Sequence, residues 1–82
     1  MTIEEIFDEV TSIIWNYQSY HVYYSYGNGI WRGHDSVSFE VYGHSDQGEG
    51  ADWTEDWSID CNGIHTEDRT YKTLEDFKNE WG

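Results

Sequence analysis

The chain has 82 residues, and its 17 Asp and Glu against four Lys and Arg give a formal charge of −13. Fifteen aromatic residues and no proline separate it from disordered acidic tails, so we expect one small folded domain over residues 1–82. The charge disfavours direct binding to nucleic acid or anionic lipid, and no apolar run approaches the roughly 18 residues of a membrane span. Partners should therefore be basic.

Cysteine use indicates a reducing compartment. Cys61 is the only cysteine, which excludes an intramolecular disulfide and a cysteine-rich zinc site. The chain also begins with acidic residues where a secretory leader would be basic. We therefore expect a cytoplasmic protein.

The first elements are a helix and a strand. Thr2 and Glu5 fit a capping box, and apolar residues recur at a helical period through residues 3–17. From residue 20 to residue 26 the period changes to two, which predicts a strand with rings on both faces. The Gly-Asn-Gly sequence at residues 27–29 interrupts the strand. Residues 30–32 either extend this strand beyond a glycine bulge or form part of a hairpin loop.

The middle of the chain predicts two more strands joined by a loop. Residues 37–42 alternate apolar and polar side chains, so one face belongs to the core and the other to solvent. Residues 43–51, with three glycines and no apolar period, predict a mobile acidic loop. The next strand extends to Cys61, which alternates in step with the apolar residues of the strand, so its side chain is predicted to be buried. Glu55 lies on the same side of the strand and is the polar exception there.

A hairpin turn is predicted after this strand. Asn62 and Gly63 favour a type I′ turn, which needs positive φ at both positions. In that register Cys61 lies opposite Ile64 and Asp60 lies opposite His65, and a short return strand continues through Thr66.

The last element is a helix capped by Thr73, with Asp76 at the capping-box position. The predicted fold class is therefore α+β: an N-terminal helix, a three- to four-stranded antiparallel sheet and a C-terminal helix. We expect two layers, with both helices on one face of the sheet.

The sequence favours no catalytic or cofactor site. The glycine-rich stretch 27–33 misses the dinucleotide fingerprint by one position and opens no helix. The four histidines lack metal-ligand spacing, and the acids around residues 46–56 are not spaced as in a calcium loop. The paired carboxylates of Glu55 and Asp56 point to opposite faces of a strand. We expect a non-enzyme without a cofactor or metal.

The remaining feature is a row of outward acids. Asp52, Asp56 and Asp60 share one strand phase, about 13 Å between neighbours, and Glu40 lies on the outward phase of the adjoining strand. Residues 45–82 hold eleven acids and three bases, so we expect the acidic face to be centred on the second half. Solubility alone is the simpler explanation, but an ordinary soluble surface intersperses both signs of charge.

This combination of size, charge, element order and an Asn62–Gly63 hairpin resembles the small acidic inhibitors of bacteriophages, especially anti-CRISPR proteins and other DNA mimics. The resemblance implies a protein in the host bacterial cytoplasm, as a monomer or weak dimer. Its partner would be a CRISPR effector such as Cas9 or a Cascade subunit, whose PAM-reading or nucleic-acid channel the acidic face would occupy.

The candidate contacts to such a partner are acids and rim aromatics. They are Glu40, Asp46, Glu49, Asp52, Asp56, Asp60, Glu67 and Asp68, with Trp31, Tyr42 and Trp53. Two other functions fit the same residues. One is an anti-restriction or immunity-type inhibitor of another basic DNA-binding enzyme, and the other is a metal- or carbohydrate-binding module that uses exposed Trp with Asp and Glu.

Overall fold

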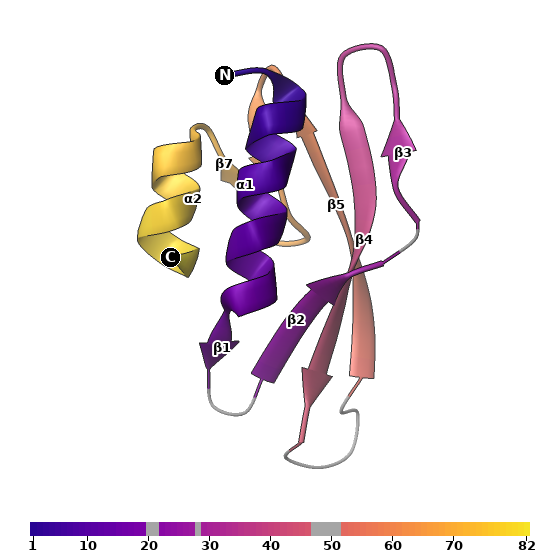
Figure 1. The fold of residues 1–82 in the computed structure, drawn as a ribbon, viewed down its shortest axis with the longest axis vertical. Coiled ribbons are helices and arrows are strands. Elements are labelled where there is room, and N and C mark those ends of the chain that lie inside the picture. The colour runs from indigo at the N-terminus through magenta and orange to yellow at the C-terminus, as the bar shows by residue number, and fades with distance from the viewer. Residues whose placement is uncertain (20–21, 28, 47–51) are drawn as a thin grey trace.

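The computed structural model describes residues 1–19, 22–27, 29–46 and 52–82, and it has an α+β fold with a helix at each end of the chain (Figure 1). The helices are α1 (Ile3–Asn16) and α2 (Leu74–Trp81). The strands are β1 (Gln18–Ser19), β2 (Val22–Tyr26), β3 (Trp31–Arg32), β4 (Val37–Ser45), β5 (Asp52–Asp60), β6 (Gly63–His65) and β7 (Thr70–Tyr71). All pairings are antiparallel, in the order β1-β2-β4-β5-β6-β7, with β3 also paired to β4.

The prediction of three to four strands is wrong, because the sheet also contains two-residue strands that are too short to show a period of two. One of them, β3, decides between the two alternatives for residues 30–32. It follows β2 along the same edge of β4, since β5 pairs with the other edge, so the chain extends the strand after an irregular break. Tyr20 and His21, which were assigned to the first strand, lie outside the described residues.

Both predicted helices are confirmed, and local hydrogen bonds begin each one. The Thr2 hydroxyl accepts the Glu5 N–H at 3.1 Å, and the Glu5 carboxylate accepts the Thr2 N–H at 2.9 Å. The bond from the Thr2 N–H to the carboxylate is the main cause that lowers the pKa of Glu5. The Thr73 hydroxyl accepts the Asp76 N–H at 3.1 Å at the start of α2. Within the described part of the chain, no helix is long and apolar enough to cross a membrane.

Both helices cover the same face of the sheet, and no described helix or strand covers the other face (Figure 1). Inward residues of β4 and β5, such as Phe39 and Trp57, pack with Phe7 of α1 and Phe77 of α2 in a single core. Trp57 is only 2% exposed. Because side chains alternate along a strand, the polar residues between these core positions all face away from the helices.

The hairpin between β5 and β6 differs from the prediction by one residue. Asp60 pairs with Gly63, so the turn residues are Cys61 and Asn62 rather than Asn62 and Gly63. The Asp60 carboxylate accepts the Asn62 N–H at 2.8 Å, which stabilises the turn at this position. Cys61 is consequently exposed at the turn, and the predicted burial of its side chain is wrong.

The loop predicted for residues 43–51 is shorter than expected, because β4 continues through Gly43 to Ser45. Gly43 pairs with Trp53, and a Cβ at Gly43 would lie 2.1 Å from the Trp53 ring. This glycine therefore provides space for a cross-strand ring and does not end the strand. Residues 47–51, including Glu49, lie outside the described residues.

Gly63, at the β5–β6 hairpin, should not tolerate a side chain. Its φ is +128°, and a Cβ there would lie 2.2 Å from the backbone oxygen of Tyr71. We expect Gly63→Ala to lower the free energy of unfolding by about 2 kcal/mol or more in urea denaturation. Gly29→Ala is the control, because its Cβ meets only the flexible end of the Glu40 side chain. Equal losses in the two variants would contradict this account.

Candidate functional site

The uncovered surface of the sheet is the candidate site, and we call it the open face. The cross-strand pairs Ser25–Tyr42, Glu40–Asp56 and Ser58–His65 show which side chains share it. Its members are Tyr23, Ser25, Ser38, Glu40, Tyr42, His44, Asp52, Thr54, Asp56, Ser58, Asp60 and His65. The open face is thus built by the same strands that hold the core on their other side.

Two carboxylates lie directly opposite each other at the centre of the open face. Glu40 pairs with Asp56, but the Glu40 carbonyl accepts the Gly27 N–H at 3.1 Å on one side. The Asp56 N–H is donated to Glu67 on the other side. The two residues therefore form a non-hydrogen-bonded pair, in which side chains are closest and Cα atoms are about 4.5 Å apart. Like charges in such a pair repel and destabilise the sheet.

Glu67 brings a third carboxylate to this position. Its Oε1 accepts the Asp56 N–H at 2.9 Å, although Glu67 lies in the segment between β6 and β7. The carboxylate is therefore held against β5 from a neighbouring loop. Asp68 lies beside it in sequence and accepts a hydrogen bond from the Thr66 hydroxyl at 3.1 Å.

Two aromatic rings lie near this acidic centre. The Tyr42 hydroxyl donates to the Glu40 carboxylate at 2.8 Å, and this bond raises the pKa of Tyr42. Its ring occupies the space above Gly27, where a Cβ would come within 1.9 Å of the ring. Trp31 on β3 is 63% exposed and pairs with Ser38 of the open face. Tyr42 is thus fixed in place, while Trp31 presents a large apolar surface to solvent.

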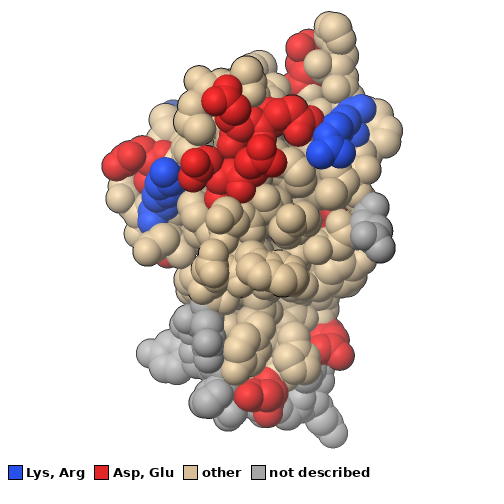
Figure 2. Space-filling view, in the orientation of Figure 1, with Lys and Arg blue, Asp and Glu red and all other residues tan. Residues whose placement is uncertain are grey.

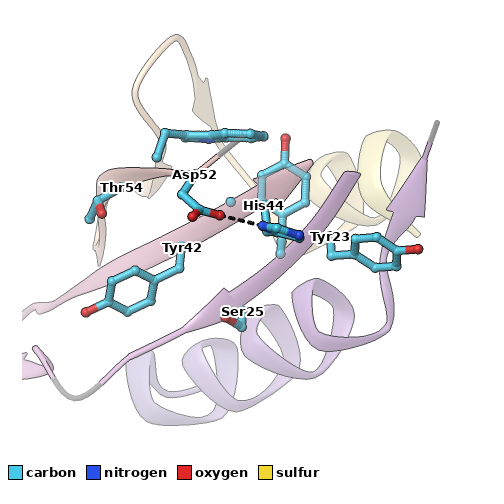
Figure 3. Close-up of a pocket in the computed structure, with 9 residues that line it drawn as sticks. Tyr23, Ser25, Tyr42, His44, Asp52 and Thr54 are labelled. Atoms are coloured by element: carbon cyan, nitrogen blue, oxygen red, sulfur yellow. Dashed lines mark hydrogen bonds and ion pairs between the residues drawn. The ribbon is translucent and has the colours of Figure 1, made fainter. Parts of the chain in front are cut away.

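Histidines pair with the acids at the two ends of β5. At one end His44 contacts Asp52, and Figure 3 shows this pair between the Tyr23 and Tyr42 side chains. A shallow pocket of about 430 Å³ lies here. At the other end the Asp60 carboxylate is 2.8 Å from His65 Nε2, and this bond, opposed by partial burial, lowers the pKa of Asp60.

Acids also gather over α1 on the helix layer, where Figure 2 shows them with basic residues on either side. The acidity is therefore not confined to one face centred on the second half of the chain. In the part of the chain that the structure describes, the Lys and Arg ion pairs all join helix acids. They are Arg32–Glu4 at 2.8 Å, Lys78–Glu9 at 3.7 Å and Arg69–Glu80 at 3.3 Å.

The partners of the open-face acids are of a different kind. The described contacts of Glu40, Asp52 and Asp60 are a tyrosine hydroxyl, histidines and backbone N–H groups. Exposed ion pairs such as those on the helices contribute little to stability, but they do offset local charge. The open face consequently has less of its negative charge offset by Lys or Arg than the helix layer.

Trp53, a predicted rim aromatic, does not share the open face with the acidic row. It is adjacent to Asp52 in an extended strand, and neighbouring strand residues point to opposite sides. Trp53 instead contacts Tyr24 on the helix side, with ring centroids 6.0 Å apart.

Glu55 accounts for the polar exception in the inward phase of β5. Its two carboxylate oxygens accept the indole N–H groups of Trp53 at 2.9 Å and Trp57 at 3.1 Å. A partly buried acid is tolerated there because both indole donors need acceptors. Burial, and then the nearby Glu55 charge, raise the pKa of Tyr24.

The other predicted site residues are dispersed. Asp46 is exposed directly after the end of β4. Asp60 lies at the end of β5, opposite the end of the β4–β5 pair that Asp46 follows. Glu49 lies outside the described residues. The predicted hairpin placed Asp60 opposite His65, and their side chains do meet, although the strand partners are Gly63 for Asp60 and Ser58 for His65. The sequence reasoning did not predict the contact of His44 with Asp52. The strand phase beginning at Glu40 would have identified His44 if Gly43 had not been interpreted as a strand end.

Comparisons with known proteins assign no family to this chain. No protein-family model, curated protein sequence or solved structure matches this chain. Among the described residues, no group of three or more His, Cys, Asp or Glu side chains is arranged to hold a metal ion.

The bond between Asp60 and His65 predicts a pH dependence. Because the folded pKa of Asp60 is lower than the unfolded value of about 3.9, its contribution is complete above about pH 5 and disappears as the pH falls through the folded pKa. We expect the stability advantage of the native protein over Asp60→Asn to shrink between pH 5 and pH 2. Thermal denaturation at each pH measures this, and a constant difference would contradict the assignment.

The role of Glu55 predicts contrasting effects at neighbouring residues. Glu55→Gln retains one acceptor oxygen for two indole donors, so we expect a loss of about 1 to 2 kcal/mol in the free energy of unfolding. Asp56→Asn removes the same charge one residue along but relieves repulsion from Glu40, so it should leave stability unchanged or slightly higher. Urea denaturation followed by tryptophan fluorescence measures both, and a reversed order would refute the assignment.

Proposed function

We propose that the protein is an inhibitor that binds a basic nucleic-acid-binding protein through the open face and blocks access of nucleic acid. The observation that carries this proposal is the facing pair of Glu40 and Asp56, with Glu67 beside it, on an uncovered sheet face. In the native sheet the carboxylates of Glu40 and Asp56 repel each other. A cationic side chain of a partner would reduce this repulsion. Solubility alone does not require two acids in the closest type of cross-strand pair.

Arginine is the side chain that suits this arrangement best. Its planar guanidinium can donate two parallel N–H bonds to carboxylate oxygens in a bidentate contact, and such charge-assisted bonds are about twice as strong as neutral ones. Proteins that bind nucleic acid present Arg and Lys where phosphates would lie. Glu40, Asp56 and Glu67 would then occupy positions that phosphates take in the natural complex.

The exposed rings and the overall charge support the same function. Trp31, 63% exposed, and Tyr42, 40% exposed, provide apolar contact area beside the acids, and Trp and Tyr are favoured anchors of protein interfaces. The net charge of −13 would accelerate the encounter with a basic surface. The hydrogen bond from Tyr42 to Glu40 holds one acid in place before binding.

A CRISPR effector in the host bacterial cytoplasm is the partner that the resemblance to phage inhibitors suggests. Effectors such as Cas9 read the PAM with arginines and hold nucleic acid in basic channels. The open face would compete for those arginines directly. An anti-restriction or immunity-type role at another basic DNA-binding enzyme would use the same contacts.

The test removes charge from the open face and, in a matched control, from the helices. Glu40→Gln with Asp56→Asn should weaken binding to the target by well over tenfold, because two charge-assisted contacts are lost. Asp8→Asn with Glu75→Gln changes the net charge equally on the other layer and should have a much smaller effect. Competition against labelled target DNA, with Cas9, Cascade and a restriction endonuclease as candidate targets, measures both.

The salt response provides a second measurement. Binding by the open face should weaken steeply between about 50 and 500 mM salt, since the screening length falls from above 10 Å to a few Å. Equal losses for the two double variants would refute the role of the open face. Failure to compete with DNA at any basic target would refute the function itself.

A further inference from the structure

Part of one edge of β5 has no strand partner in the part of the chain that the structure describes. β4 pairs with β5 from Asp52 to Ile59, whereas β6 pairs on the other side only from Ser58 to Asp60. Among the described residues, no strand pairs with that second side from Asp52 to Asp56. Figure 1 shows this half of β5 at the margin of the sheet, away from the helices.

The backbone groups that point to this edge can be identified. The Asp56 N–H is donated to Glu67, on the side away from β4. In an antiparallel ladder the N–H and C=O of one residue point to the same side and alternate along the strand. Asp52, Thr54 and Asp56 therefore direct their backbone donors and acceptors to the open edge, which has the alternation that a further strand requires.

Glu67 occupies the place where the neighbouring strand would continue. Extending the pairs Asp60–Gly63 and Ser58–His65 by two residues would put Glu67 opposite Asp56. The chain leaves that path in a turn in which the Thr66 N–H donates to the Arg69 carbonyl at 2.9 Å. The Glu67 carboxylate accepts the bond that a strand backbone would otherwise accept, and a side chain is more easily displaced than a paired strand.

The side chains along the edge determine what could add to it. An added strand would run beside Asp52, Thr54 and Asp56 on the open face and beside Trp53 and Glu55 on the other face. Three of these five side chains are carboxylates, and opposite charges are favourable in cross-strand pairs. Trp53 could also pack against the stem and charge of an arginine.

The same charges exclude a second copy of this chain as the occupant. Antiparallel pairing of two β5 edges about Thr54 would place Asp52 of each copy opposite Asp56 of the other. Like charges directly opposite each other destabilise a sheet. Charge complementarity therefore selects a basic segment.

We propose that the edge of β5 from Asp52 to Asp56 accepts an extended, Lys- and Arg-rich segment of a partner protein as an additional strand. The backbone of the segment would pair with Thr54 and displace the Glu67 carboxylate from Asp56. This surface adjoins the open face, but the inference does not require the partner to bind nucleic acid. Backbone pairing would add directional contacts to an interaction that charge alone leaves unspecific.

The test uses a seven-residue peptide that alternates Lys and Thr, with blocked termini, and the native protein. Saturating peptide should slow hydrogen exchange of the Thr54 amide by at least about tenfold, because that amide enters a strand pair. A peptide methylated on alternate backbone nitrogens retains the charge but cannot pair, so it should bind at least about tenfold more weakly. A peptide with Glu in place of Lys should not bind.

Variants at Thr54 provide the matched pair. Thr54→Pro removes the outward N–H at an edge position where proline is tolerated, and it should reduce binding of the Lys-Thr peptide at least about tenfold. Thr54→Val keeps the N–H and should bind as the native protein does. Circular dichroism verifies that each variant is folded, and if Thr54→Pro does not fold, the methylated peptide decides the question on the native protein.

Equal binding of the plain and methylated peptides, with unchanged exchange at Thr54, would overturn the inference. That result would leave the proposed function intact, because charge contacts to the open face survive backbone methylation. Conversely, protection of Thr54 without competition against DNA at any basic target would support strand addition and refute the proposed function.

Discussion

The pairing of β4 with β5 is the interaction on which the rest of the molecule depends. Eight residue pairs, from Val37–Ile59 to His44–Asp52, join the two nine-residue strands. Because side chains alternate, this register directs Phe39 and Trp57 towards the helices while Glu40 and Asp56 face solvent. A slip by one residue would exchange the two faces, burying carboxylates and exposing rings. Core burial therefore holds the acids in positions that their own repulsion opposes.

The distribution of positive charge divides the molecule into two layers with different properties. Arg32, Lys78 and Arg69 pair with acids of the helices, where acids also serve helix capping. On the open face the carboxylates contact histidines and a tyrosine hydroxyl instead. Negative charge on the helix layer is thus partly offset within the chain. The open face keeps the repulsion between Glu40 and Asp56, and this contrast is the basis of the proposal that it binds a basic partner.

The sequence correctly predicted the elements that are stabilised by residues close together in the chain. The capping box at Thr2 and the cap at Thr73 both depend on residues within one turn, and both helices formed as expected. The features that were missed depend on contacts between distant residues. Gly43 remains in a strand because the Trp53 ring needs the space above it, and Glu55 faces inward because two indole groups donate to it. The β5–β6 turn moved by one residue because Asp60 binds the Asn62 N–H and Gly63 supplies the positive φ.

The sequence by itself determined the periodicities, and therefore which residues could be inward or outward in each element. The outward phase of Asp52, Asp56 and Asp60 follows from a period of two and requires no knowledge of neighbours. Only the tertiary structure decided which strands lie beside each other. It placed Glu40 opposite Asp56, brought Glu67 against β5 and, among the described residues, left the edge of that strand from Asp52 to Asp56 without a strand partner. Strand register and edges depend on pairing between segments far apart in the chain, and no local pattern encodes such a pairing.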